Sequence, residues 1–178
     1  GDFTHPVWRE ELKASLIPDE ESGFYRLKNP FGSADMEREI PELADVNAVP
    51  PRFVLEAEIS SIYKKNGSVR KVHSLVYVPD FDAADRLCAR LAAVGNLNSD
   101  GRPILGLDVR HLLEMVLEIP RAFMIPAHIW TPWFSLFGSK SGFDSPEECF
   151  EDLTPHIFAA ETGLSSDPDM NRCWSRLD

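Results

Sequence analysis

The alternation of apolar and polar residues predicts a chain of mixed helices and strands. Apolar residues at helical spacing predict three helices, over residues 7–16, 82–97 and 109–119. Runs of β-branched and aromatic residues predict four strands, over residues 52–60, 72–78, 122–129 and 157–160. Strands that alternate with helices indicate the α/β class and, more narrowly, part of a βα barrel.

Turn and cap residues add detail to this pattern. Asn66-Gly67 is the strongest short hairpin signal, so the strands around 59–65 and 69–78 are expected to pair. Asp108 is expected to cap the helix that follows it, and Ser145-Pro146 resembles the start of another helix. Residues 19–51 show little periodicity and predict a long excursion with one short hairpin, and residues 170–177 are expected to form a terminal amphipathic stretch.

Composition narrows the class of protein. A length of 178 residues corresponds to about one domain, and 43% hydrophobic residues are enough for a core. The sequence has no apolar run long enough for a membrane span, so no membrane partner is expected. The three cysteines, Cys88, Cys149 and Cys173, lack a CxxC pair, which disfavours a disulfide framework or zinc ribbon and makes the cytoplasm the expected location. A net charge of −11 argues against a broad basic nucleic-acid surface but allows local phosphate contacts.

Metal-ligating residue types recur at or near the ends of the predicted strands. They are Glu58, His73, His128 and Glu161, with His5 in a similar loop at the head of the chain. In βα barrels the carboxyl ends of the strands carry the chemistry, and imidazoles and carboxylates from separate strands can build a hydrolytic divalent-metal site. The alternative for each residue is an ordinary core or surface position. His111 is expected to face solvent, and His156 fits either role.

The loop after His128 is unusually aromatic. Its aromatic residues are Trp130, Trp133, Phe134, Phe137 and Phe143, and they stand beside Ser139, Lys140, Ser141 and Gly142. Aromatic rings can stack on a base, and a Gly/Ser/Lys turn before a helix offers donors to phosphate. The alternative is a lid whose apolar side chains plug a barrel mouth. Lys64, Lys65, Arg70 and Lys71 likewise form either a small basic patch or a solvated hairpin.

Several segments together resemble the PHP (polymerase and histidinol phosphatase) metallohydrolases, and more narrowly the endonuclease Q group, whose members cut DNA next to deaminated bases. They are GDFTHP, FVLEAEIS, KVHSLVYVPDF, GRPILGLDVRHLLEMVLEI, PAHIWTPWFSLFGSKSGFDSPEECF and ETGLSSDPDMN. The resemblance runs nearly end to end, and the segment after His128 is its most specific part. It implies a distorted seven-stranded βα barrel with a trinuclear metal cluster.

The resemblance also implies roles for particular residues. His5, Glu58, His73 and His128 match metal ligands of the family, with Glu58 as the bridge between two metals, and Glu58 and His128 are the expected catalytic residues. Asp2 belongs to the same motif as His5, and Glu161 lies beside the site. The expected DNA contacts come from the aromatic loop: Trp130, Trp133, Phe134, Ser139, Lys140 and Ser141. Zinc is the first metal expected, with manganese and iron as alternatives.

Two motifs of the family, an initial His-x-His and a final Asp-x-His, do not occur in the chain. Residues 1–178 are therefore expected to form the central part of a single PHP-type domain, with a partial (β/α)7 barrel and at most one well-formed metal site. The expected function is metal-dependent hydrolysis of DNA next to deaminated bases, which the fragment itself is not expected to complete. The alternatives are a PHP phosphatase that acts on a small phosphoester, and a non-catalytic metal-binding fragment.

Overall fold

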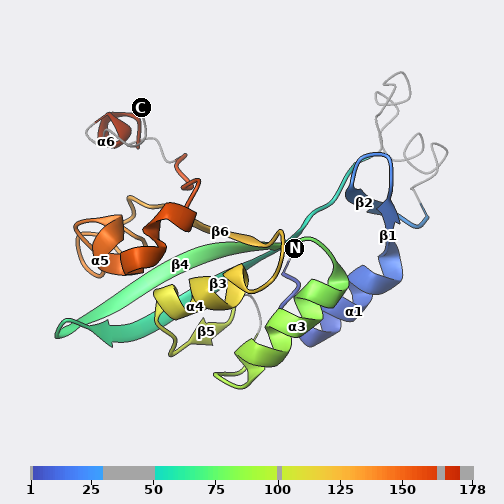
Figure 1. Ribbon diagram of the computed structural model, residues 1–178, viewed down its shortest axis with the longest axis horizontal. Coiled ribbons are helices and arrows are strands. Elements are labelled where there is room, and N and C mark those ends of the chain that lie inside the picture. Colours follow the sequence, from blue (N-terminus) through green and yellow to red (C-terminus); the bar gives the residue numbers. More distant parts are fainter. Residues whose placement is uncertain (1, 30–50, 100–101, 164–166, 173–178) are drawn as a thin grey trace, which may run out of the picture.

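The computed structural model describes residues 2–29, 51–99, 102–163 and 167–172. Its centre is a four-stranded mixed sheet in the order β5-β3-β4-β6 (Figure 1). β3 (Leu55–Lys65) and β4 (Ser68–Val78) form a long antiparallel hairpin, β6 (Phe123–Pro126) is antiparallel to β4, and the short β5 (Ile104–Leu105) is parallel to β3. The α/β class is confirmed by this arrangement, while the partial barrel stays a prediction.

The β3–β4 hairpin was expected from its turn. Asn66 and Gly67 have φ values of 52° and 76°, the left-handed conformation that a tight two-residue hairpin requires and that glycine adopts without strain. The turn fixes a register in which Lys65 pairs with Ser68 and Leu55 with Val78. Because side chains alternate between the two faces of a strand, this register decides which residues share a face.

One face of the sheet is covered by helices. α3 (Phe81–Ala92) begins at the Asp80 cap and α4 (Val109–Leu117) at the expected Asp108 cap. Both helices lie against the sheet (Figure 1), and they bury Leu87 and Leu112 completely. Strand residues such as Ile59 and Val76 are likewise fully buried, so the core lies between the helices and this face.

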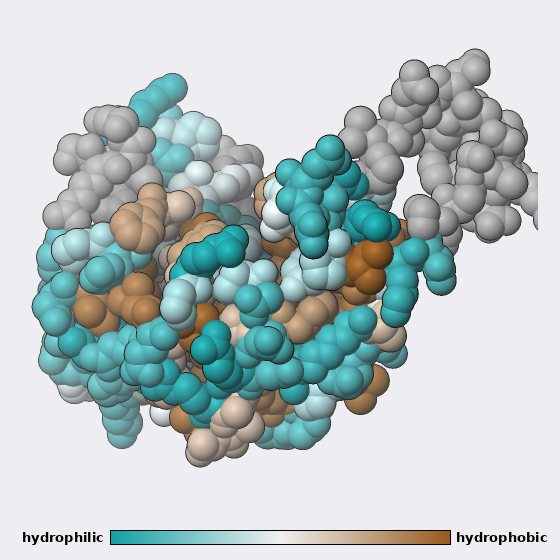
Figure 2. Space-filling model, turned by 45° about the vertical axis from the view of Figure 1, so that its right-hand side comes forward, coloured by the Kyte–Doolittle hydropathy of each residue, from teal (hydrophilic) through white to brown (hydrophobic). Residues whose placement is uncertain are grey.

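The remaining elements lie around this core. α1 (Pro6–Ser15) leads into the small hairpin of β1 (Leu16–Asp19) and β2 (Phe24–Leu27), and α6 (Asp167–Asn171) ends the described chain. α5 (Pro146–Phe150) starts at Ser145, whose hydroxyl accepts from the Glu148 N–H, as the sequence predicted. The 3-10 helix η2 (Glu151–His156) follows it. The space-filling view shows apolar patches separated by hydrophilic residues (Figure 2).

One predicted strand is absent from the described structure, and two predicted segments lie mostly outside the described residues. The predicted strand over 157–160 is wrong, because this segment has no regular structure. The next residue, Glu161, lies beside the end of β6: its backbone N–H donates to the Pro126 carbonyl, and its carbonyl accepts from the Ile129 N–H. Most of the amphipathic stretch over 170–177 and most of the 19–51 excursion lie outside the described residues. No helix in the described part of the chain is long and apolar enough to cross a membrane.

Candidate metal centre

Three metal-ligating side chains meet on the face of the sheet opposite α3 and α4. Glu58 lies on β3, His73 on β4, and His128 two residues after β6. One ligand atom from each lies within 4.8 Å of the other two. Nδ1 of His73 is 3.0 Å from Oε1 of Glu58 and 3.1 Å from Nε2 of His128. The predicted convergence of these residues is confirmed, while their role as metal ligands stays a prediction.

The register of the sheet explains how Glu58 and His73 meet. Glu58 pairs with Leu75, two residues from His73, so Glu58 and His73 are diagonal neighbours on one face. The expectation that both stand at strand ends is therefore wrong: they lie inside antiparallel strands of 11 residues each. Diagonal pairing across a hairpin brings them together, rather than the shared edge of parallel strands.

His128 reaches the same point through a local turn of the backbone. The Ala127 N–H donates to the His73 carbonyl at 3.0 Å, which continues the β4–β6 ladder one residue past β6. The backbone of His128 has a φ of 32°, a value that residues other than glycine rarely adopt. This conformation turns the chain out of the ladder. Such strain persists only where neighbouring contacts hold it.

Glu161 supplies these contacts. Its Oε2 accepts the His128 backbone N–H at 2.7 Å and lies 3.3 Å from Nδ1 of the same residue. A carboxylate beside Nδ1 favours the tautomer with the proton on Nδ1, which leaves the Nε2 lone pair directed at His73. Glu161 was expected beside the site, and the structure gives it contacts that orient both the backbone and the ring of His128.

Electrostatics keep His73 neutral. Burial first, and then the charge of Arg102 and the neighbouring imidazole of His128, lower the pKa of His73 to about 3. His73 as a whole is only 8% exposed. A neutral imidazole presents a free lone pair, which is the form that binds a metal.

A pocket of about 530 Å³ opens beside the three residues. It is lined by Asp2, Trp8, Glu56, Glu58, Leu75, Tyr77, Arg102 and Glu161. Burial raises the pKa of Glu56, and the nearby carboxylates of Glu58, Asp2 and Glu161 raise it further. Among these lining residues Arg102 is the one basic side chain. The pocket therefore favours cations.

Sequence reasoning missed Glu56 and Arg102. The Glu56-Ala57-Glu58 alternation within a strand was a usable signal, because period two puts both carboxylates on one face. Arg102 gave no such signal. It reaches the site because β5 pairs with β3, with Ile104 opposite Ser60, and the same parallel register extended by two residues sets Arg102 beside Glu58.

Arg102 makes the closest polar contacts of the site. Its Nη1 donates to Oε1 of Glu58 and lies 2.7 Å from Nδ1 of His73. Because a guanidinium has donors only, its contact with Nδ1 assigns that nitrogen as an acceptor, so Glu58 and His73 both accept from Arg102. Two imidazole nitrogens and one carboxylate oxygen match the ligand set of catalytic zinc and also suit manganese and iron. The donor set therefore fits a divalent ion.

His5 is not brought into this cluster. It caps α1, where Nδ1 accepts from the Trp8 N–H at 3.5 Å, and its ring centroid lies 4.9 Å from that of Trp8. The same N-terminal segment still borders the pocket through Asp2 and Trp8. His111 is exposed, as expected, and so is His156.

The aromatic loop does border the site, as predicted. The Phe134 ring lies against the His73 ring with centroids 4.7 Å apart, and the Phe134 carbonyl accepts the His73 backbone N–H at 3.0 Å. Trp133 is 49% exposed, and Nζ of Lys71 lies 5.0 Å from its ring centroid. Ser139 and Lys140 are exposed as well.

Two other residues of the loop serve its internal structure. The Trp130 indole N–H donates to the side chain of Asn171, and the Trp130 ring packs against Phe137. Ser141 is buried, where its hydroxyl accepts from the Phe134 N–H and donates to the Lys71 carbonyl. These contacts hold the loop in shape beside β4.

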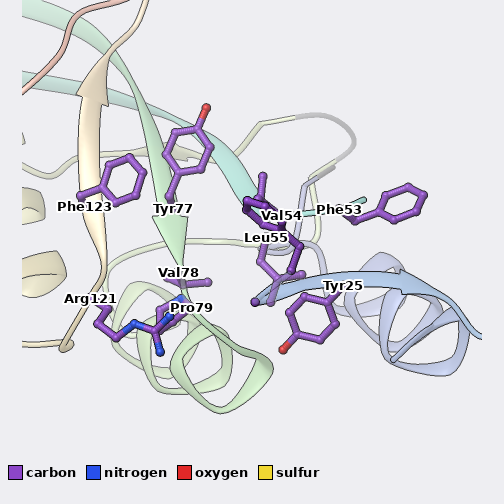
Figure 3. Close-up of a pocket in the computed structure, with 11 residues that line it drawn as sticks. Tyr25, Phe53, Val54, Leu55, Tyr77, Val78, Pro79, Arg121 and Phe123 are labelled. Atoms are coloured by element: carbon purple, nitrogen blue, oxygen red, sulfur yellow. The ribbon is translucent and has the colours of Figure 1, made fainter. Parts of the chain in front are cut away.

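A second, apolar pocket of about 220 Å³ shares Tyr77 with the acidic one. Figure 3 shows the rings of Tyr77 and Phe123 side by side at its edge, and their centroids are 4.8 Å apart with nearly parallel planes. Arg121 and Tyr25 also line it. Tyr77 on β4 thus joins the two pockets.

Comparison with known proteins gives two solved structures, whereas no protein-family model and no curated protein matches the sequence. One is Endonuclease Q in complex with a 27-mer duplex substrate with an abasic lesion at the active site; it is 26% identical, with a TM-score of 0.68, over 99% of this chain and 36% of that chain. The other is the lesion-specific endonuclease PfuEndoQ from Pyrococcus furiosus, 27% identical with a TM-score of 0.65, over 96% of this chain and 34% of that chain. The chain spans about a third of the length of these neighbours. It has an endonuclease Q-like fold.

Proposed function

We propose that this chain carries part of the catalytic centre of a PHP-type, metal-dependent endonuclease that cleaves DNA next to deaminated bases. The observation that carries the proposal is the convergence of Glu58, His73 and His128 beside one acidic pocket, which Glu58 itself lines. Both structural neighbours are described as endonucleases, one as lesion-specific and the other in complex with a DNA substrate. The proposal includes the partial barrel and a single PHP-type domain of which residues 1–178 are the central part.

In this proposal the three converging residues hold one divalent ion. Such an ion, when bound, lowers the pKa of water and stabilises negative charge on a phosphoryl oxygen. Glu58 contributes the anionic ligand, and His73 and His128 contribute neutral imidazole nitrogens. Glu161 keeps His128 in the tautomer that binds a cation through Nε2. His5, whose neighbours Asp2 and Trp8 line the pocket, is proposed as a ligand of a neighbouring ion.

The aromatic loop is the proposed contact to DNA. Trp133 offers an exposed ring for stacking on a base, and Ser139 and Lys140 offer donors to phosphate. Phe134 lies between this surface and His73 and so links the DNA contact to the metal site. Trp130 and Ser141 support the loop from inside. Local contacts of this kind are compatible with a net charge of −11, because bound cations offset the carboxylates.

The proposed location is the cytoplasm. Cys88 and Cys149 are buried free thiols, and free thiols are typical of proteins in a reducing compartment. Burial raises the pKa of Cys88 to about 11 and also raises the pKa of Cys149, so both thiols stay protonated at neutral pH.

The test uses the protein as its gene encodes it, freed of metal and then supplied with zinc, manganese or iron. Duplexes with and without a single uracil report on cleavage, and a phosphomonoester reports on phosphatase activity. We expect metal-dependent cleavage beside the uracil, and loss of that cleavage in Glu58→Gln. The Glu20→Gln variant is the matched control, since Glu20 is an exposed residue between β1 and β2.

The other outcomes decide against this proposal. Phosphate release from the phosphomonoester without cleavage of DNA identifies a phosphatase. Metal binding with neither activity identifies a non-catalytic metal-binding protein. Cleavage that survives Glu58→Gln and His73→Gln at full rate places the catalytic metal elsewhere.

A further inference from the structure

One guanidinium nitrogen already lies where the three candidate ligands meet. Nη1 of Arg102 donates to Oε1 of Glu58 and lies 2.7 Å from Nδ1 of His73. These two atoms are 3.0 Å apart, and Nε2 of His128 lies 3.1 Å from Nδ1 of His73, so they are the atoms best placed to bind the ion. The contacts are charge-assisted hydrogen bonds, the stronger class of hydrogen bond in proteins.

The arginine and a metal cannot use these atoms together. A zinc ion binds its nitrogen and oxygen ligands at about 2.0–2.2 Å along the same lone pairs that now accept from Nη1. An ion in that position would overlap the guanidinium and be repelled by its charge. Metal binding therefore requires the Arg102 side chain to leave.

We propose that Arg102 is an exchangeable internal cation, which holds the ligand atoms together in the metal-free protein and sets the metal affinity by competing for them. This inference rests on the metal site of the proposed function. Glu58 and His73 are 3.0 Å apart, and one guanidinium nitrogen contacts both of them. The guanidinium thus bridges the two side chains and keeps them close to their binding geometry.

The surroundings allow the exchange. The Arg102 side chain is 41% exposed, so it can move without opening the core. Three further carboxylates, those of Asp2, Glu56 and Glu161, line the pocket beside it. A displaced guanidinium therefore keeps anionic neighbours, which limits the free energy that the metal must supply to displace it.

The experiment compares Arg102→Met with the native protein by calorimetric titration with zinc and with manganese. Methionine has a similar length but neither charge nor donor. The ion that belongs to this site is identified as the one lost in His73→Gln. Arg86→Met is the control for net charge, because Arg86 is exposed on α3. Thermal unfolding in chelator is measured for every variant.

Competition predicts two opposite effects of Arg102→Met. The metal-free protein should unfold at a lower temperature, because its ligand acceptors lose their cation. The dissociation constant for the metal should fall by about tenfold or more, because no charge-assisted hydrogen bond has to be broken. Arg86→Met should change neither quantity.

Other results overturn the inference and distinguish its failure from that of the metal site. Equal or weaker metal affinity in Arg102→Met, with the ion still lost in His73→Gln, means that Arg102 does not compete and only supports the structure. A metal-loaded crystal structure with Arg102 still on Glu58 and His73 has the same meaning. If neither the native protein nor Arg102→Met binds an ion that is lost in His73→Gln, the metal site itself is refuted, and the inference with it.

Discussion

The two contacts of the Glu161 carboxylate with His128 offer the sharpest test of how the candidate metal centre is built. Glu161→Gln keeps an oxygen that can accept the His128 backbone N–H but removes the carboxylate charge beside Nδ1. Glu161→Ala removes both contacts. The two variants therefore separate the orientation of the ring from the support of the strained backbone at His128, whose φ is 32°.

The contacts of Glu161 rank the two variants within a general range of effects. Partners that orient a metal-binding histidine typically contribute about 10–100-fold to metal affinity. We expect Glu161→Gln at the lower end, about tenfold or about 1.4 kcal/mol, because the backbone hydrogen bond survives. Glu161→Ala should approach about 100-fold or about 2.7 kcal/mol, because His128 can then relax out of its strained conformation.

The assay is calorimetric titration of the metal-free protein with zinc, with Glu20→Gln as the control for lost charge. Glu20 lies in the exposed turn between β1 and β2, so its removal should leave the affinity unchanged. Equal affinities of Glu161→Ala and the native protein would refute the orienting role. Equal losses in the Gln and Ala variants would show that charge alone matters and that the backbone contact at His128 contributes nothing.

Three further predictions concern DNA, pH and the core. Trp133→Ala should weaken binding of single-stranded DNA by about 1–3 kcal/mol in fluorescence anisotropy, whereas Trp130→Phe should mainly lower the unfolding temperature. Unchanged DNA affinity with a lower unfolding temperature in Trp133→Ala would instead indicate that the loop is a lid that plugs a barrel mouth. Because burial above all lowers the His73 pKa from 6.5 to about 3, the unfolded chain binds one more proton than the folded chain between these pH values, and the free energy of unfolding should decrease as the pH is lowered, by up to about 1.4 kcal/mol per pH unit. Urea titrations in chelator at about pH 4–7 should give a smaller change in the free energy of unfolding per pH unit for His73→Gln than for the native protein. Equal pH dependence in the two proteins would contradict the prediction. Leu112→Ala, at a fully buried position on α4, should cost about 2–5 kcal/mol in the same titrations, and a loss below about 1 kcal/mol would show that α4 does not pack as described.

Local signals in the sequence were enough to predict much of the fold. The Asn66-Gly67 turn, the Asp108 cap and the Ser145 cap each act within a few residues, and each was found where expected. The strand over 157–160 failed because four apolar or small residues carry no information about a partner strand, and the structure gives that segment none.

The candidate site was predictable only in part, for a related reason. Glu58, His73 and His128 were found by residue type and by position on apolar strands. Their geometry was not, because the expectation placed them at or near strand ends, whereas Glu58 and His73 lie inside long antiparallel strands. Arg102 was missed entirely, since its place depends on the parallel pairing of a two-residue strand, β5, with β3. Parallel pairing joins segments far apart in sequence, and nothing local specifies it.

The hairpin couples the chemistry of this chain to its core. Along β3, Glu56 and Glu58 face the pocket while Ala57 and Ile59 are fully buried on the other face. A slip of one residue would exchange the two sets, burying carboxylates among α3 and α4 and exposing the apolar side chains. The free energy that keeps Ile59 in the core therefore also keeps Glu58 diagonal to His73. The register of the sheet thus sets Glu58 and His73 side by side, the turn after β6 adds His128, and one guanidinium nitrogen of Arg102 contacts the first two.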